Sequence, residues 1–189
     1  RPSSEWRMHQ ALYSSHPEAM AVVHCHSLHA TALACQRRRI PPFHYMVSIA
    51  GGDDIPCADY ALFGSEELSQ IVCKTLQQRR ACLMANHGQI ALGRTPAEAL
   101  MIASEVEVQA SFYYGTLAIG GPVLLSNEQM NDVFSAWLFC PLRSVHFCTV
   151  LPVEREVCCP SVLAASSHST SPFTSCGDTI FASSPACTV

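Results

Sequence analysis

The stretch Val22-Val23-His24-Cys25-His26 has the spacing of a candidate metal site. Successive side chains of a β-strand point to opposite faces, so His24 and His26 would share a face, with Cα atoms about 6.5–7 Å apart. Two imidazoles at this spacing can converge on one ion, at about 2.0–2.1 Å for each Zn–N bond. Two ordinary strand histidines that bind no metal would show the same pattern. Cys25 would face the other way, and we expect it to be a small buried side chain.

Further ligands would have to come from distant segments. His87 lies in Asn86-His87-Gly88, a predicted turn between two extended segments, where functional side chains are common. Glu5 begins a predicted helix, and a carboxylate is favoured there by the helix dipole whatever else it does. Spacing alone does not bring these residues together. The remaining histidines are expected in other settings: His9 and His16 on a helix surface, His29 in a helix, His44 in a strand, and His146 and His168 in the C-terminal part.

The elements that must position these residues alternate between helical and extended patterns. Helices are predicted at residues 5–15, 28–37, 66–76 and 95–117, and strands at 21–27, 43–50, 81–86 and 89–93. Three helices have start signals: Ser3 or Ser4 for the first, Ser65 for the third, and the Thr95-Pro96-Glu98 capping box for the last. The sequence therefore predicts an α/β fold.

Composition excludes several classes of protein. The 189 residues are 49% hydrophobic and 14% charged, with a net charge of −4, and the basic cluster Arg37-Arg38-Arg39 is short. A mildly acidic chain is a poor ligand for nucleic acid, and no apolar run reaches the roughly 18–20 residues of a membrane span. The 11 cysteines form no CxxC pair. Without a secretory leader we expect reduced thiols in a soluble cytoplasmic protein, and the low charge favours an oligomer.

The composition changes near Trp137. The segment that follows is rich in Cys, Ser and Pro and contains no Lys. Such a stretch buries too little apolar surface to offset its chain entropy. We expect a folded domain at residues 1–137 and a poorly ordered tail at 138–189. The abrupt start at Arg1 suggests that an N-terminal segment is missing.

Several short motifs in register resemble the class II aldolase/adducin-head family. They are Pro2-Ser3-Ser4-Glu5-Trp6, Val23-His24-Cys25-His26-Ser27, His44-Tyr45-Met46, Ala50-Gly51-Gly52, Phe63-Gly64 and Asn86-His87-Gly88. The resemblance covers about residues 1–137. It implies a central, mainly antiparallel β-sheet sandwiched between α-helices, in a ring of four subunits with active sites at their interfaces.

The resemblance also implies a role for each matching residue. His24, His26 and His87 would bind Zn²⁺, with Glu5 as the fourth group and as the acid/base at the carbon beside the carbonyl. Ser3 and Ser4 would hold the substrate phosphate near a helix N-terminus, which suits an anion on electrostatic grounds. Phe63 would form an apolar wall for the aldehyde. Tyr45 would come from a neighbouring subunit and handle the proton on the aldehyde oxygen, although a core aromatic in a strand fits its pattern as well.

The implied activity is a zinc-dependent aldol cleavage of L-fuculose 1-phosphate to dihydroxyacetone phosphate and L-lactaldehyde. The single lysine, Lys74, lies on a predicted helix, so a Lewis-acid metal would take the place of a Schiff base. Zn, Co and Mn all suit such ligands. A sugar-phosphate 4-epimerase, a thio-sugar dehydratase and a non-catalytic adducin-head module remain alternatives. Without the family's first segment, we expect weak phosphate capture and impaired activity.

Overall fold

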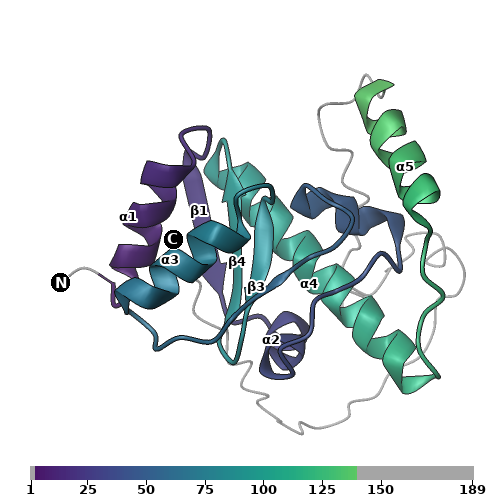
Figure 1. Ribbon diagram of the computed structural model, residues 1–189, viewed down its shortest axis with the longest axis horizontal. Coiled ribbons are helices and arrows are strands. Elements are labelled where there is room, and N and C mark those ends of the chain that lie inside the picture. Colours follow the sequence, from purple (N-terminus) through teal and green to yellow (C-terminus); the bar gives the residue numbers. More distant parts are fainter. Residues whose placement is uncertain (1–2, 140–189) are drawn as a thin grey trace, which may run out of the picture. The chain divides into compact units, whose positions relative to one another are not determined.

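A computed structural model describes residues 3–139, with side chains to Trp137 (Figure 1). The helices are α1 (Trp6–Ser15), α2 (Leu28–Cys35), α3 (Glu66–Thr75), α4 (Pro96–Ala118) and α5 (Asn127–Phe139), together with the 3₁₀ helix η1 (Tyr45–Ala50). The strands are β1 (Ala21–Cys25), β2 (Cys57–Ala58), β3 (Ala81–Met84) and β4 (Gly88–Gly93). No helix in the described range is long and apolar enough to cross a bilayer.

The four strands form one sheet in the order β1-β4-β3-β2. The pairs β1–β4 and β4–β3 are antiparallel, whereas β3–β2 is parallel. In the β1–β4 register, His24 lies opposite Ile90 and Cys25 opposite Gln89. The prediction of an α/β fold around a mainly antiparallel sheet is confirmed.

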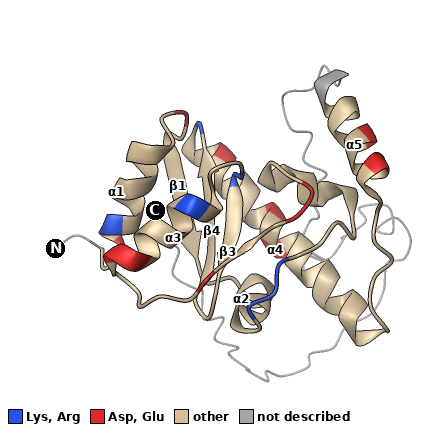
Figure 2. Ribbon diagram, viewed as in Figure 1, with Lys and Arg blue, Asp and Glu red and all other residues tan. Residues whose placement is uncertain are grey.

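Alternate side chains of the strands pack into two hydrophobic cores, one on each face of the sheet. Val23, Leu83 and Ala91 pack in the core shared with α2, α4 and η1. Val22 and Ile90 pack in the other core, shared with α1 and α3. The strands themselves carry no Lys, Arg, Asp or Glu, and charged residues appear on helices and loops (Figure 2). Period-two alternation therefore sends the even-numbered β1 residues, His24 included, towards the α1 side.

Two of the predicted helix starts are confirmed. The Ser65 hydroxyl accepts the Leu68 N–H at 3.1 Å, and the Thr95 hydroxyl accepts the Glu98 N–H at 3.1 Å. The Glu98 carboxylate bonds the N–H of Arg94, one residue before the cap, at 2.7 Å. Helix α1 differs from prediction, because it begins at Trp6 with Glu5 as its N-cap.

The predicted strand at residues 43–50 is wrong: Tyr45–Ala50 is the 3₁₀ helix η1. The ring of His44 caps it by accepting the Met46 N–H at 3.3 Å, and Gly51 ends it at φ +85°. Val47 and Ala50, three residues apart, are both fully buried. An apolar run of this length suits a short helix as well as a strand.

His16 is buried, with 6% of its surface exposed, rather than on a helix surface as predicted. It follows the last residue of α1, so the chain turns there and carries the ring inward. Helix α5 was not predicted from the sequence. It continues past Trp137, where the domain was expected to end, as far as Phe139. The remainder of the expected tail, with His146 and His168, lies outside the described residues.

Candidate metal centre

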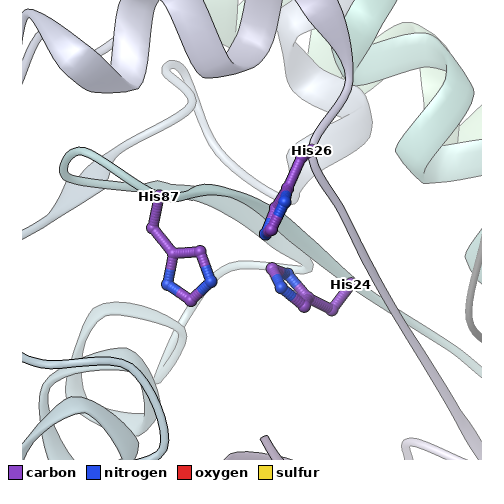
Figure 3. Close-up of side chains that lie close together, drawn as sticks. All are labelled: His24, His26 and His87. Atoms are coloured by element: carbon purple, nitrogen blue, oxygen red, sulfur yellow. The ribbon is translucent and has the colours of Figure 1, made fainter. Parts of the chain in front are cut away.

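Three imidazoles meet where β1 ends beside the β3–β4 turn. The rings of His24, His26 and His87 have centroids 4.8–5.0 Å apart. One nitrogen from each lies within 4.8 Å of the others. Figure 3 shows the three rings turned towards a common space. Two of the side chains come from one strand end and the third from a turn 61 residues later, so the tertiary fold makes the cluster.

The orientation of His24 is fixed from the neighbouring strand. Its Nδ1 lies 2.9 Å from the carbonyl oxygen of Gln89. A carbonyl only accepts, so Nδ1 carries the proton and Nε2 keeps its lone pair for another partner. A hydrogen bond from the second ring nitrogen is the usual way in which proteins orient a metal-binding histidine.

Two of the three histidines, His24 and His87, are also held in the uncharged form that a metal requires. Burial, joined by the proximity of His87 and His26, outweighs the Gln89 hydrogen bond and lowers the pKa of His24 from its ordinary 6.5 to about 4. Burial, followed by the proximity of His26, lowers the pKa of His87. At neutral pH both rings are therefore neutral donors. Three imidazole nitrogens without a thiolate suit a first-row divalent cation, so this chain's own residues fit the metal expected from the sequence.

Glu5 lies beside this cluster but outside the group of three. Its side chain is 7% exposed and lines the same cavity as the histidines. Oε2 accepts the N–H of Gly64 at 3.3 Å. Gly64 has φ +71°, and a β-carbon there would lie 2.8 Å from the Ser4 carbonyl oxygen. The left-handed glycine thus lets its loop approach the start of α1 closely enough to bond Glu5.

The cavity around the histidines has a volume of about 920 Å³. Ser3, Ser4 and Phe63 line it, and their contact with a substrate stays a prediction. Both serines are exposed and lie just before Glu5, the N-cap of α1, and Phe63 is 63% exposed. The lining of the cavity therefore offers both polar and apolar groups beside the three histidines.

Tyr45 does not line this cavity. It opens η1, half exposed, with its ring 4.7 Å from that of His44. The core position that its pattern also allowed is therefore not observed. Its role in catalysis remains a prediction.

Two residues around the centre were missed by sequence reasoning. Gln89, fully buried, supplies the carbonyl that orients His24, while its Nε2 donates to Ser27 Oγ at 2.7 Å and to the Ala103 carbonyl oxygen at 3.0 Å. A lone amide in an otherwise apolar strand was the available signal. Gly88 allows close packing, since a β-carbon there would lie 2.7 Å from Cδ2 of His26. Cys25, predicted to be buried, is half-buried and lines the cavity.

Comparison with known proteins agrees with this fold. The family model described as "Class II Aldolase and Adducin N-terminal domain" matches residues 1–114. The L-fuculose phosphate aldolase of Escherichia coli (strain K12) is 52% identical over 143 residues, which are 75% of this chain and 66% of that protein. A 5-methylthioribulose-1-phosphate/5-deoxyribulose-1-phosphate aldolase of Rhodospirillum rubrum is 47% identical over 133 residues, 70% of this chain and 60% of that one.

A solved structure titled "L-fuculose 1-phosphate aldolase" superimposes with a TM-score of 0.70 at 39% identity, covering 73% of this chain and 65% of that one. The chain belongs to the class II aldolase and adducin N-terminal domain family. It spans about two thirds of the length of the curated relatives that it matches.

Proposed function

We propose that this chain carries the metal centre of a zinc-dependent aldolase that cleaves L-fuculose 1-phosphate to dihydroxyacetone phosphate and L-lactaldehyde. The observation that carries the proposal is the convergence of His24, His26 and His87 on one cavity, in a chain 52% identical to a fuculose phosphate aldolase. A divalent ion bound there supplies Lewis-acid stabilisation of the negative charge that develops as the carbon–carbon bond breaks.

The protein groups handle the protons and the phosphate. The bond between the third and fourth sugar carbons breaks, its electron pair stays on the third carbon, and the hydroxyl on the fourth becomes the aldehyde. Glu5, which lines the cavity and accepts the Gly64 N–H, would return a proton to the third carbon. The serines before α1 would hold the phosphate at the helix N-terminus, where backbone N–H groups favour an anion.

We assign the removal of the proton from the fourth-carbon hydroxyl to Tyr45 of a neighbouring subunit. Tyr45 is half exposed and outside its own chain's cavity, which supports a role across an interface. The proposal therefore includes a homotetramer with sites between subunits. Phe63, at the cavity wall, would pack against the methyl end of the aldehyde.

A second candidate substrate is a 5-deoxypentulose 1-phosphate. It is favoured by the 47% identity to the methylthioribulose/deoxyribulose phosphate aldolase. The two substrates share the phosphate end and would give the same three-carbon product, and they differ in the aldehyde that leaves. The cavity residues described above do not discriminate between them.

The test is to supply each sugar phosphate to the purified chain and to follow dihydroxyacetone phosphate with a coupled dehydrogenase. We expect release that stops on addition of a chelator and is absent in His24→Ala, with the faster sugar identifying the substrate class. Metal-loaded protein that releases no three-carbon product above the His24→Ala background would contradict the proposed aldolase. A well-folded protein that takes up no metal would favour the adducin-type module, and a changed sugar without cleavage would favour an epimerase.

A further inference from the structure

A carboxylate on α4 holds the segment that follows the second histidine. Glu107 Oε1 accepts the backbone N–H of His29 at 2.8 Å and also lies 2.8 Å from the His29 Nδ1. Its Oε2 accepts the N–H of Ala30 at 2.9 Å. These N–H groups belong to the first turn of α2 and are 77–78 residues distant in sequence from Glu107.

Glu107 takes the place of a local helix cap. Ser27 is the N-cap of α2, but its side chain makes no capping hydrogen bond. The second and third residues of a helix have no intrahelical partner for their N–H groups, and a carboxylate in this position is also favoured by the helix dipole. Burial raises the pKa of Glu107, but hydrogen bonds from the Ser27 hydroxyl, from the Ala30 and His29 N–H groups and from the His29 ring outweigh it, so the net pKa is lowered. The carboxylate is thus ionised and bonded on both oxygens.

The helix start that Glu107 holds adjoins His26. His26 comes after the last residue of β1 and directly before Ser27, so neither strand pairing nor helical hydrogen bonds fix its backbone. It is exposed, and its ring makes no hydrogen bond within residues 3–139, in contrast to the ring of His24. The position of the His26 side chain therefore depends on the backbone at the start of α2.

The same network reaches His24. The side-chain Nε2 of Gln89 donates to Ser27 Oγ at 2.7 Å, and the backbone carbonyl oxygen of Gln89 accepts from His24. Because the Ser27 oxygen accepts from Gln89, its hydroxyl proton is available for Glu107. One carboxylate is thereby connected to the supports of two of the three histidines.

We propose that Glu107 is a positioning residue of the metal centre, which sets the place of His26 through the start of α2 and supports His24 through Ser27 and Gln89. It touches neither metal nor substrate. The inference rests on the proposed metal function of the three histidines. Outer groups that orient metal ligands typically contribute about 10- to 100-fold in metal affinity, so loss of this carboxylate should weaken metal binding by that factor.

The test measures Zn²⁺ affinity by chelator competition, and the visible absorption bands of bound Co²⁺, in Glu107→Ala and Glu107→Gln. The alanine variant should bind Zn²⁺ about 10- to 100-fold more weakly, with shifted Co²⁺ bands that report a changed ligand arrangement. The glutamine variant keeps one acceptor oxygen and most of the shape, so its loss should be smaller but at least about threefold.

Glu105→Gln is the matched control, because Glu105 lies on the same helix and accepts a hydrogen bond from Gln109 of that helix. Its Zn²⁺ affinity and Co²⁺ bands should equal those of the parent chain. Glu107 variants with parental affinity and parental bands, even with a lowered unfolding temperature, would reduce Glu107 to a helix cap and overturn the proposal. If the alanine variant does not fold, the glutamine variant decides by the same criteria. A parent chain that binds no Zn²⁺ would instead overturn the proposed metal centre.

Discussion

His16 and His24 are both imidazoles largely withdrawn from water, yet their surroundings suit different roles. At His16 both ring nitrogens have partners: Nδ1 lies 2.9 Å from Ser15 Oγ, and Nε2 lies 3.0 Å from the Leu76 carbonyl oxygen. At His24 only Nδ1 is bonded, and the other nitrogen faces two further histidines across the cavity. Burial by itself does not mark a ligand, because a metal site also needs a nitrogen left without a protein partner.

The contrast between the two histidines predicts opposite results for metal binding. His24→Ala removes one of three converging nitrogens, and we expect its affinity for Zn²⁺ or Co²⁺ to fall by at least about 100-fold, the upper end of what even an outer-sphere change costs. His16→Ala should stay within about twofold of the parent chain, as measured by chelator competition. Equal losses in the two variants would remove the distinction.

His16, which should not matter for metal affinity, should matter for the stability of the fold. His16→Ala removes a buried ring and its hydrogen bonds between α1 and α3, for an expected cost of about 2 kcal/mol in the free energy of unfolding. Urea unfolding of the metal-free protein measures this directly. The Leu76 carbonyl keeps the Arg79 N–H as a second partner at 3.0 Å, which limits the penalty. A cost below about 0.5 kcal/mol would show that the buried ring is not a structural link.

A third expected effect is on the pH dependence of stability. The pKa of His24 is about 4 in the folded chain and 6.5 when exposed, so below pH 6.5 the unfolded state binds more protons than the folded state. The stabilisation due to a neutral His24 is thus complete above pH 6.5 and is lost as the pH falls to about 4. Metal-free His24→Gln should show a shallower decline over this window in urea midpoints. Parallel declines would mean that His24 is not held neutral.

The sequence predicted where the strands of the site lie, because alternation and the Asn86-His87-Gly88 turn are local signals. It carried the first strand too far, to residue 27, whereas β1 ends at Cys25 and leaves His26 outside the strand. It also predicted where α3 and α4 begin, because the side chains of Ser65 and Thr95 each accept a backbone N–H only three residues further along the chain. It failed at residues 43–50, where an apolar run is compatible with a strand or a short helix, and at His16, whose burial depends on the distant Leu76.

The metal triad could be predicted only through a resemblance, since nothing in spacing brings His87 to His24. The supporting residues had weaker signals. Gln89 and Glu107 act through backbone atoms and neighbouring side chains of other elements. Such partners follow from strand register and helix packing, which are known only once the chain is folded.

The pairing of His24 with Ile90 ties the triad to one alignment of β1 against β4. If β1 slid by a single residue, His24 would exchange faces with Cys25 and the third imidazole would lose its two companions. An ion bound among them would stabilise the correct β1–β4 pairing, relative to every misaligned pairing, by its binding free energy. Metal present while the chain folds would then favour the correct strand register of this sheet, in addition to any part that the ion plays in catalysis.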